Sequence, residues 1–430
     1  MTSSPPSPLK LSKHRDFRLL WAGQTTSALG SEVSTLAIPL IAGLLLNASP
    51  MELGLLTAAR KAPVLFASLP AGALADRWRK RPIMIWSLTL SGLIMLTLPL
   101  AAMAGALTIG HLWAVALLAG ICEVFYSPAY QTYPLLILGP ERIMQGNARL
   151  TTTITVSGMS GPALSGVLIA LLGPAKAVLV DAASFLAAAA TMAFIRTPEP
   201  KPQPRDRSGL RREIAEGLRY VVRHPVIGPL LFGMATISFC LAGTSALEIT
   251  YLARELGWSS QALGLVLGVG MLGGLAGGML AEPLTSRYGT ARVLIGAALA
   301  YPLFVSPIGL IGPGLAGQIV MGVSWGLLLV AAIVFQSVQK SLRQLLTPAE
   351  MQGRLAASAR WITWGATPLG ALLAGALATW AGMRGALLVF AAGLFAGPVV
   401  MWRIRTAIAV AVAPRAPTST LDGVADRESR

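Results

Sequence analysis

Apolar segments long enough to cross a lipid bilayer recur along this chain of 430 residues. A helix needs about 20 apolar residues to span the hydrocarbon core, and only 12% of the residues are charged while 54% are hydrophobic. Since backbone groups in lipid must be hydrogen-bonded within the protein, each segment is predicted to be a helix. We expect twelve membrane spans, at 17–46, 51–75, 82–105, 109–138, 150–173, 175–195, 226–253, 260–286, 290–311, 313–339, 356–381 and 384–405.

The basic residues indicate how the spans are oriented. With both termini in the cytoplasm, all but five of the 34 Lys and Arg fall on the cytoplasmic side, as the positive-inside rule requires. We therefore attribute the net charge of +16 to membrane topology and not to nucleic-acid binding. A multi-pass protein of the plasma membrane (a bacterial inner membrane) is expected. The five basic residues assigned to the outer side are Arg60, Lys61, Lys176, Arg254 and Arg384.

The second half of the chain repeats motifs of the first at an offset of about 206 to 210 residues, for example Met144-Gln145-Gly146 and Met351-Gln352-Gly353. Parallel six-span repeats are typical of facilitator-type transporters. The predicted organisation is a cytoplasmic tail (1–16), a six-helix bundle (17–195), a cytoplasmic linker with an amphipathic helix (196–225), a second six-helix bundle (226–405) and a C-terminal cytoplasmic tail (406–430).

One short connection carries an acid and four bases, Gly72-Ala73-Leu74-Ala75-Asp76-Arg77-Trp78-Arg79-Lys80-Arg81. It resembles the loop signature of the major facilitator superfamily, G-x-x-x-D-[RK]-x-G-[RK]-[RK], with Arg79 in place of the second glycine. The resemblance implies an all-α membrane protein of two six-helix bundles. It also implies a conformational latch on the cytoplasmic side, in which Gly72 permits close helix approach and Asp76 pairs with basic residues: Arg77, Arg79 and Arg81.

Within this superfamily the chain resembles the macrolide-efflux and enterobactin-exporter branch of drug:proton antiporters. The resembling stretches include 17–24, 181–185 and 348–354. Span 5 also resembles the antiporter motif G-x8-G-x3-G-P-x2-G-G, with small residues at the required positions, and this favours export over import. The motif residues that carry this similarity are Ser157, Gly161, Pro162, Ser165 and Gly166. A close-packing face for a neighbouring helix explains the same residues.

Three acids lie on spans that line the central cavity in the resembled fold: Glu32, Glu123 and Glu248. Glu32 and Glu123 are expected near mid-membrane and Glu248 closer to the outer surface, so the first two are the preferred candidates. A carboxylate at mid-span costs roughly 2.5–3.5 kcal/mol, so it is seldom present without a function. We interpret these acids as candidates for proton coupling; the alternative is that each caps a helix or pairs with a buried base. Asp181 lies near Lys176 and is interpreted as marking the start of span 6.

Polar and aromatic residues on the same spans are candidates for substrate contact. Glu123, Tyr126 and Tyr130 share one helical face, which suits a cationic or amphipathic aromatic ligand. Span 1 carries a row of polar residues, Gln24, Ser27, Ser31 and Thr35, next to Glu32. Besides substrate contact, the hydroxyl groups among them can simply hydrogen-bond to carbonyls of their own helix. The remaining cavity candidates are Gln24, Ser31, Trp325 and Gln336.

Enzyme chemistry and ATP binding have no counterpart in the sequence. There is no Walker-type phosphate loop or nucleophile elbow, and the three histidines are scattered, so neither a metal site nor a cofactor is predicted. We expect a secondary active transporter, monomeric by default, that exchanges protons for a small amphipathic compound such as a drug, siderophore or metabolite. The alternatives are a proton-coupled importer of a small nutrient and a non-transporting membrane receptor or scaffold.

Overall fold

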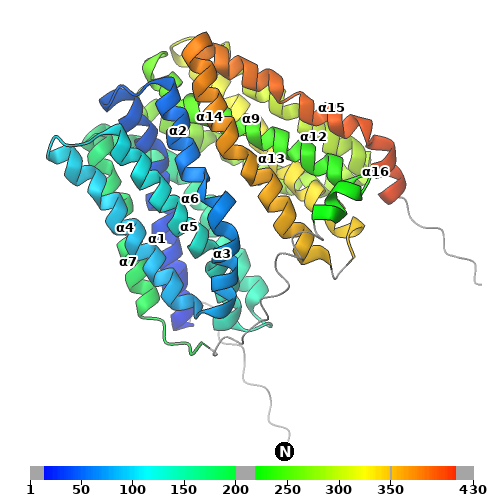
Figure 1. The fold of residues 1–430 in the computed structure, drawn as a ribbon, viewed down its shortest axis with the longest axis horizontal. Coiled ribbons are helices and arrows are strands. Elements are labelled where there is room, and N and C mark those ends of the chain that lie inside the picture. Colours follow the sequence, from blue (N-terminus) through cyan, green and yellow to red (C-terminus); the bar gives the residue numbers. More distant parts are fainter. Residues whose placement is uncertain (1–13, 200–217, 349–350, 413–430) are drawn as a thin grey trace, which may run out of the picture.

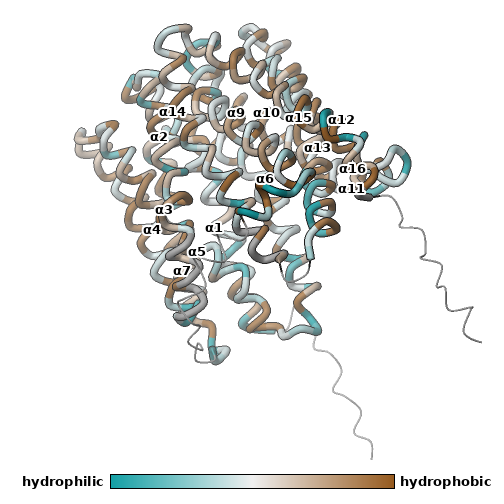
Figure 2. The backbone as a smooth tube through the Cα atoms, turned by 45° about the vertical axis from the view of Figure 1, so that its right-hand side comes forward, coloured by the Kyte–Doolittle hydropathy of each residue, from teal (hydrophilic) through white to brown (hydrophobic). Residues whose placement is uncertain are grey.

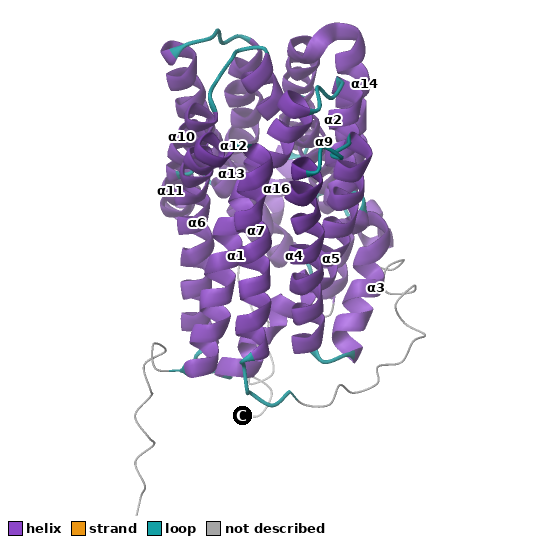
Figure 3. Ribbon diagram, turned by 90° about the vertical axis from the view of Figure 1, so that its left-hand side faces the viewer, coloured by secondary structure: helices purple, strands orange, loops and turns teal. Residues whose placement is uncertain are grey.

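The computed structural model describes residues 14–199, 218–348 and 351–412, and all regular structure in these ranges is helical (Figures 1 and 3). The first bundle holds residues 15–193. Its helices are α1 (Arg15–Leu40) with the π-helix η2 (Ile41–Leu45), α2 (Pro50–Lys61), α3 (Pro63–Arg77), α4 (Lys80–Met103), α5 (Ile109–Leu138), α6 (Ile143–Leu172) and α7 (Pro174–Ala193).

The second bundle begins at residue 227 and packs beside the first (Figure 1). Hydrophobic residues recur along the helices of both bundles (Figure 2). The helices of the second bundle are α9 (Ile227–Arg254), α10 (Ser260–Gly270), α11 (Leu272–Tyr288), α12 (Thr290–Val305) with the 3-10 helix η3 (Ser306–Gly309), α13 (Leu315–Leu346), α14 (Gln352–Gly393), α15 (Ala396–Arg403) and α16 (Arg405–Val412).

Ten helices of the described chain are long and apolar enough to cross a membrane. Two further crossings are not counted among these ten, one because its helix is divided and the other because two spans are joined in one helix. The second span is divided between α2 and α3 at Ala62, so neither piece reaches the required length alone. Conversely, α14 contains a reversal at Gly382, whose φ of 74° ends one span and starts the next. The described residues therefore form twelve crossings in two sets of six, which confirms the predicted fold class.

The two bundles touch at one end of the molecule. We call the end with the η2–α2 connection the Asn47 end, and the opposite end, where α1 begins, the Arg15 end. Gly54 on α2 lies so close to α14 that a Cβ there would be 2.5 Å from the Ala371 carbonyl oxygen. Near the same end, the Ser260 hydroxyl donates to the Gly166 carbonyl across the bundle interface at 3.2 Å. Small residues thus allow the helix backbones to meet, as expected in lipid.

The remaining hydrogen bonds between the bundles, among the described residues, lie toward the same end or at mid-depth. Thr250 donates to the Pro39 carbonyl at 3.3 Å, and Arg254 donates to the Ala48 carbonyl at 3.2 Å. The one nearest the Arg15 end joins Trp361 to the Leu65 carbonyl at 3.4 Å. Figure 1 shows the two bundles diverging toward the Arg15 end. The structure is therefore closed at the Asn47 end.

Two acids anchor the segment that leaves the first bundle. The Asp16 carboxylate accepts from the backbone N–H groups of Arg196 (3.1 Å) and Thr197 (2.7 Å) and from the Thr197 hydroxyl (2.6 Å). The Glu199 carboxylate accepts from the N–H groups of Lys80 and Arg81, which open α4. An acid suits these unsatisfied donors at a helix N-terminus. Most of the predicted linker helix, including Leu210 and Ile214, lies outside the described residues; residues 218–223 are helical.

Candidate functional site

A polar cavity with a volume of about 440 Å³ lies between the bundles. Helices α2 and α3 of the first bundle form one wall, and α9, α12, α13 and α14 of the second bundle form the others. We call it the interbundle cavity. Its volume and its apolar lining with a few polar groups are typical of small-molecule sites. The polar and aromatic lining residues are Thr57, Lys61, Ser238, Thr244, Ser245, Glu248, Tyr301, Phe304, Trp325, Gln336, Trp364 and Thr367.

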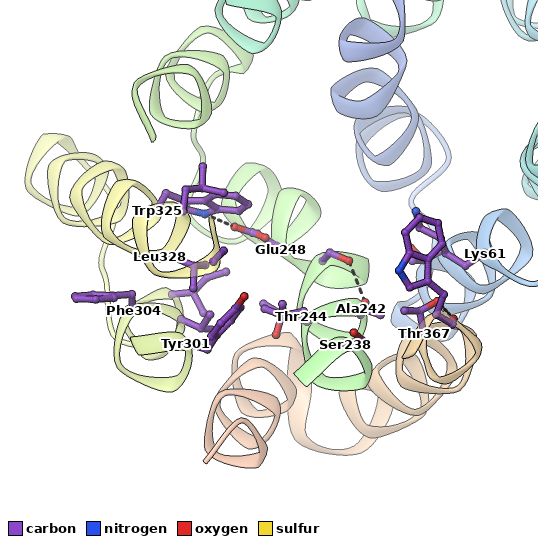
Figure 4. Close-up of a pocket in the computed structure, with 18 of the residues that line it drawn as sticks. Lys61, Ser238, Ala242, Thr244, Glu248, Tyr301, Phe304, Trp325, Leu328 and Thr367 are labelled. Atoms are coloured by element: carbon purple, nitrogen blue, oxygen red, sulfur yellow. Dashed lines mark hydrogen bonds between the residues drawn. The ribbon is translucent and has the colours of Figure 1, made fainter. Parts of the chain in front are cut away.

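Three predicted site residues meet in this cavity. The Trp325 indole on α13 donates to the Glu248 carboxylate on α9 at 2.7 Å (Figure 4), and Glu248 is only 6% exposed. About three turns further along α13, Gln336 lines the cavity and accepts from the Gln339 side chain at 2.8 Å. The acid is thus held at the wall by a neutral donor, and it forms no ion pair with another described residue.

Lys61 enters the same cavity from the first bundle (Figure 4). Its expected place at the outer side, together with that of Arg60, is wrong. Both residues end α2, whose twelve residues extend about 18 Å from the Asn47 end, and the hydrocarbon core is about 30 Å thick. The two cations therefore lie near mid-depth. The sequence carried this signal, since a Lys and an Arg interrupt a predicted apolar span at its centre.

A second cavity, of about 230 Å³, lies inside the first bundle among α1, α2, α4, α5 and α7. We call it the N-bundle cavity. Four predicted residues line it and not the interbundle cavity: Gln24, Ser31, Glu123 and Tyr126. The Tyr126 hydroxyl donates to the Gln24 side chain at 3.0 Å. The candidates that the sequence assigned to one central cavity are therefore divided between two.

Glu123 forms an ion pair with Arg60, whose Nη2 lies 4.0 Å from Oε2. The acid is 63% exposed at its side chain, so this pair contributes little to stability. Tyr130 stacks on Tyr126 with ring centroids 5.5 Å apart, but it does not line the N-bundle cavity, and its buried hydroxyl has no hydrogen-bond partner among the described residues. Of the three residues predicted to share one helical face, Glu123 and Tyr126 thus line the N-bundle cavity and Tyr130 does not.

Asp181 is the most deeply buried acid of the N-bundle cavity, at 1% exposure. Its interpretation as a helix-start residue is wrong, because α7 begins at Pro174 and Asp181 lies two turns inside it. Its carboxylate accepts from the hydroxyls of Ser34 and, at 3.4 Å, of Ser31, both on α1. Gly30 makes room for it, since a Cβ there would lie 3.1 Å from Asp181 Oδ1. The sequence could have indicated this burial, because Asp181 lies seven residues inside an apolar span.

Glu32 and the span 5 motif lie together at the contact of α1 with α6. The Glu32 side chain packs directly against Gly161 and lines neither of the two cavities. Ser165 is fully buried and donates to the Gly161 carbonyl at 2.6 Å. Pro162 and Gly166 face α10 of the other bundle, and Ser157 is 2% exposed. The small residues of this motif therefore allow close contact both within and between the bundles.

The predicted latch is described only in part. Gly72, Asp76 and Arg77 belong to α3, but their side chains lie outside the described residues. Arg79 is exposed just before α4. Arg81 donates through Nε to the Met192 carbonyl at 3.1 Å and through Nη2 to the next carbonyl, in the last turn of α7. A cation is favourable at a helix C-terminus, so in this structure Arg81 joins two helices of one bundle.

Two histidines act as helix caps. His14 Nδ1 accepts from the Phe17 N–H at 3.3 Å, and His224 Nδ1 accepts from Val226 and Ile227 at 3.2 Å. Burial lowers the pKa of His224, which keeps its ring in the neutral form that can accept. Among the described residues no three His, Cys, Asp or Glu side chains gather as a metal site.

Comparison with known proteins gives whole-chain matches. A family described as transmembrane secretion effector matches residues 3–423. The multidrug efflux pump Tap of Mycolicibacterium fortuitum is 27% identical over 407 residues, 90% of this chain and 93% of the relative. The enterobactin exporter EntS of Citrobacter koseri is 23% identical over 372 residues, 85% and 86% of the two chains.

Solved structures share the fold at low sequence identity. A bacterial homologue of the iron transporter ferroportin, in an inward-facing state, superposes with a TM-score of 0.73 at 17% identity, over 91% of this chain and 99% of that one. A bacterial homologue of the lysosomal transporter Spinster, inward-facing and occupied, gives a TM-score of 0.72 at 15% identity, over 95% and 100%. At these identities the likeness concerns the fold alone.

Proposed function

This chain belongs to the transmembrane secretion effector family of the major facilitator superfamily, and from that membership we propose that it exports a small amphipathic compound in exchange for protons. The superfamily predicted from the Gly72–Arg81 connection is confirmed, and with it a transporter of small molecules embedded in a membrane. The relatives named as a multidrug efflux pump and an enterobactin exporter support the outward direction.

We propose that the Arg15 end faces the cytoplasm of a bacterial cell, with both termini on that side. Its connections carry Arg15, Arg18, Arg79, Lys80 and Arg81, as the positive-inside rule requires. In this orientation the closed Asn47 end is the outer side. The protein then stands in an inward-facing state, ready to receive a substrate from the cytoplasm or the inner leaflet. Rocking of the two bundles would open the outer side.

The interbundle cavity is the main support for export by this protein, because both bundles contribute walls to it, whereas the N-bundle cavity lies within one bundle. The size of the interbundle cavity suits one drug-sized molecule. In an antiporter the substrate and the proton must compete, and Glu248 is placed for this. A protonated Glu248 is neutral, whereas an ionised one can bind the substrate. The Trp325 indole N–H donates to this carboxylate and holds it at the cavity wall.

The test is flux in proteoliposomes with an imposed pH gradient, with ethidium as the probe. We expect uptake into inside-out vesicles when their interior is acidic, and loss of the dependence on the pH gradient in Glu248→Gln. If Glu123→Gln or Glu32→Gln loses that dependence while Glu248→Gln retains it, the coupling acid lies elsewhere. Uptake only by right-side-out vesicles would indicate an importer, and binding without flux a receptor or scaffold.

Each substitution of an acid is compared with its wild-type protein at matched amounts in the membrane. The elution volume in detergent reports both folding and oligomeric state, and we propose a monomer. A variant that elutes as wild type but transports without responding to the pH gradient has lost coupling alone.

A further inference from the structure

The interbundle cavity holds two opposite charges that do not touch. Lys61 reaches it from the end of α2, and Glu248 lies on α9 across the cavity (Figure 4). The one ion pair among the described side chains is Arg60 with Glu123, and no described side chain hydrogen-bonds to the Lys61 ammonium. A lysine at mid-depth in a membrane is costly and marks a functional site by default.

These charges restrict what can enter the cavity. A purely cationic molecule is attracted by Glu248 but repelled by Lys61, and a purely anionic molecule meets the reverse. A molecule that is anionic at one end and cationic at the other satisfies both walls at once. In a cavity with low-dielectric walls each of these interactions is stronger than in water.

We propose that the interbundle cavity binds a dipolar organic molecule, with its anionic group at Lys61, its cationic group at Glu248 and an apolar or aromatic body between them. This assignment rests on the proposed function and names its substrate class. The rest of the lining agrees with it, because the Trp325 indole contacts Glu248 (Figure 4). Further aromatic surface comes from Tyr301 and Phe304 on α12 and from Trp364 on α14. Aromatic faces suit both a flat body and an organic cation.

The two charges also belong to different bundles, Lys61 to the first and Glu248 to the second. A dipolar ligand therefore bridges the halves that must move relative to each other. It binds best when both walls are near its ends, so its binding free energy differs between the conformations. Such differential binding is what a ligand needs in order to shift a conformational equilibrium.

Three probes with one aromatic body test the assignment: 6-(aminomethyl)-2-naphthoate, which is dipolar, 2-naphthoate, which is anionic, and 2-naphthylmethylammonium, which is cationic. Binding to the purified full-length protein is followed by quenching of tryptophan fluorescence. We expect the dipolar probe to bind at least tenfold more tightly than either singly charged probe. Equal affinities for the dipolar and the cationic probe would overturn the proposal.

Substitutions separate the two ends. Lys61→Met should abolish the advantage of the dipolar over the cationic probe, and Glu248→Gln should abolish its advantage over the anionic probe. Lys61→Arg keeps the charge and should keep the ranking. The exchanged pair Lys61→Glu with Glu248→Lys should again prefer the dipolar probe. Lys176→Met, at the start of α7 and outside both cavities, is the matched control and should leave all affinities unchanged.

Failure of the dipolar site and failure of export give different results. If the ranking and its loss in Lys61→Met are seen but no probe or dye is carried in proteoliposomes, export fails and the binding site stands. If ethidium is exported against a pH gradient and Lys61→Met leaves the ranking of the three probes unchanged, export stands and the dipolar site is refuted.

Discussion

The closed Asn47 end should open when a single methyl group is added at Gly54. A Cβ there would lie 2.5 Å from the Ala371 carbonyl oxygen and 3.0 Å from the Gly375 Cα. Since an ordinary carbon–oxygen contact is about 3.3 Å, α2 and α14 must separate by roughly 0.8 Å in Gly54→Ala. Overpacking of this kind costs about 1 to 3 kcal/mol, and only the state in which the two helices meet bears that cost. The population open at the Asn47 end should therefore rise about 5- to 150-fold.

The assay is the rate at which a membrane-impermeant maleimide, added from outside, labels a cysteine introduced at Ser245 in the interbundle cavity. The native Cys122 and Cys240 are replaced by alanine, and both are buried. The control is Gly322→Ala in α13, where a Cβ would meet nothing within 4 Å, because it gains the same helix propensity without the clash. An unchanged labelling rate in Gly54→Ala, or an equal rise in Gly322→Ala, would refute the reasoning.

Three further predictions concern stability, each measured as the midpoint of thermal unfolding in detergent. Ser34→Ala removes a donor from the buried Asp181 carboxylate and should lower the unfolding free energy by about 1 to 3 kcal/mol; an unchanged midpoint would show that this carboxylate does not depend on Ser34. Asp16→Ala removes the acceptor of three hydrogen bonds and should destabilise more than Asp16→Asn, so equal losses would count against the anchoring role. His224→Ala should destabilise more at pH 8 than at pH 5. Because burial lowers the pKa of His224, its contribution exists above the unfolded-state pKa of about 6.5 and is lost as the pH falls below that value; an effect equal at both pH values would contradict it.

Local hydropathy was sufficient to predict most of the architecture. The span expected at 226–253 is α9 at Ile227–Arg254, and the break of α14 at Gly382 separates the spans expected at 356–381 and 384–405. This agreement has a simple cause. In lipid the backbone N–H and C=O groups of each segment must hydrogen-bond within that segment. The length and polarity of a segment therefore determine its secondary structure independently of the rest of the chain.

The sequence could identify individual residues of the site, but not which of them contact one another. Glu248 and Trp325 were both identifiable as polar groups in apolar spans, but their hydrogen bond joins residues 77 positions apart. Likewise, the sequence shows Asp181 as an acid in an apolar span, and only the packing of α1 on α7 shows that Ser34 donates to it. The rotation of each helix about its axis decides such contacts, and hydropathy does not report it where lipid and protein are equally apolar.

By itself, the sequence determined that the chain forms a membrane-embedded helical protein of two repeated halves, because apolar length and basic connections act locally. Tertiary structure decided that Lys61 and Glu248 share one cavity, while Glu123 and Asp181 lie in another. The physical reason is that charges in a membrane interact over the distances between helices. Those distances are set by close contacts of small residues such as Gly54 and Gly166 with a neighbouring helix.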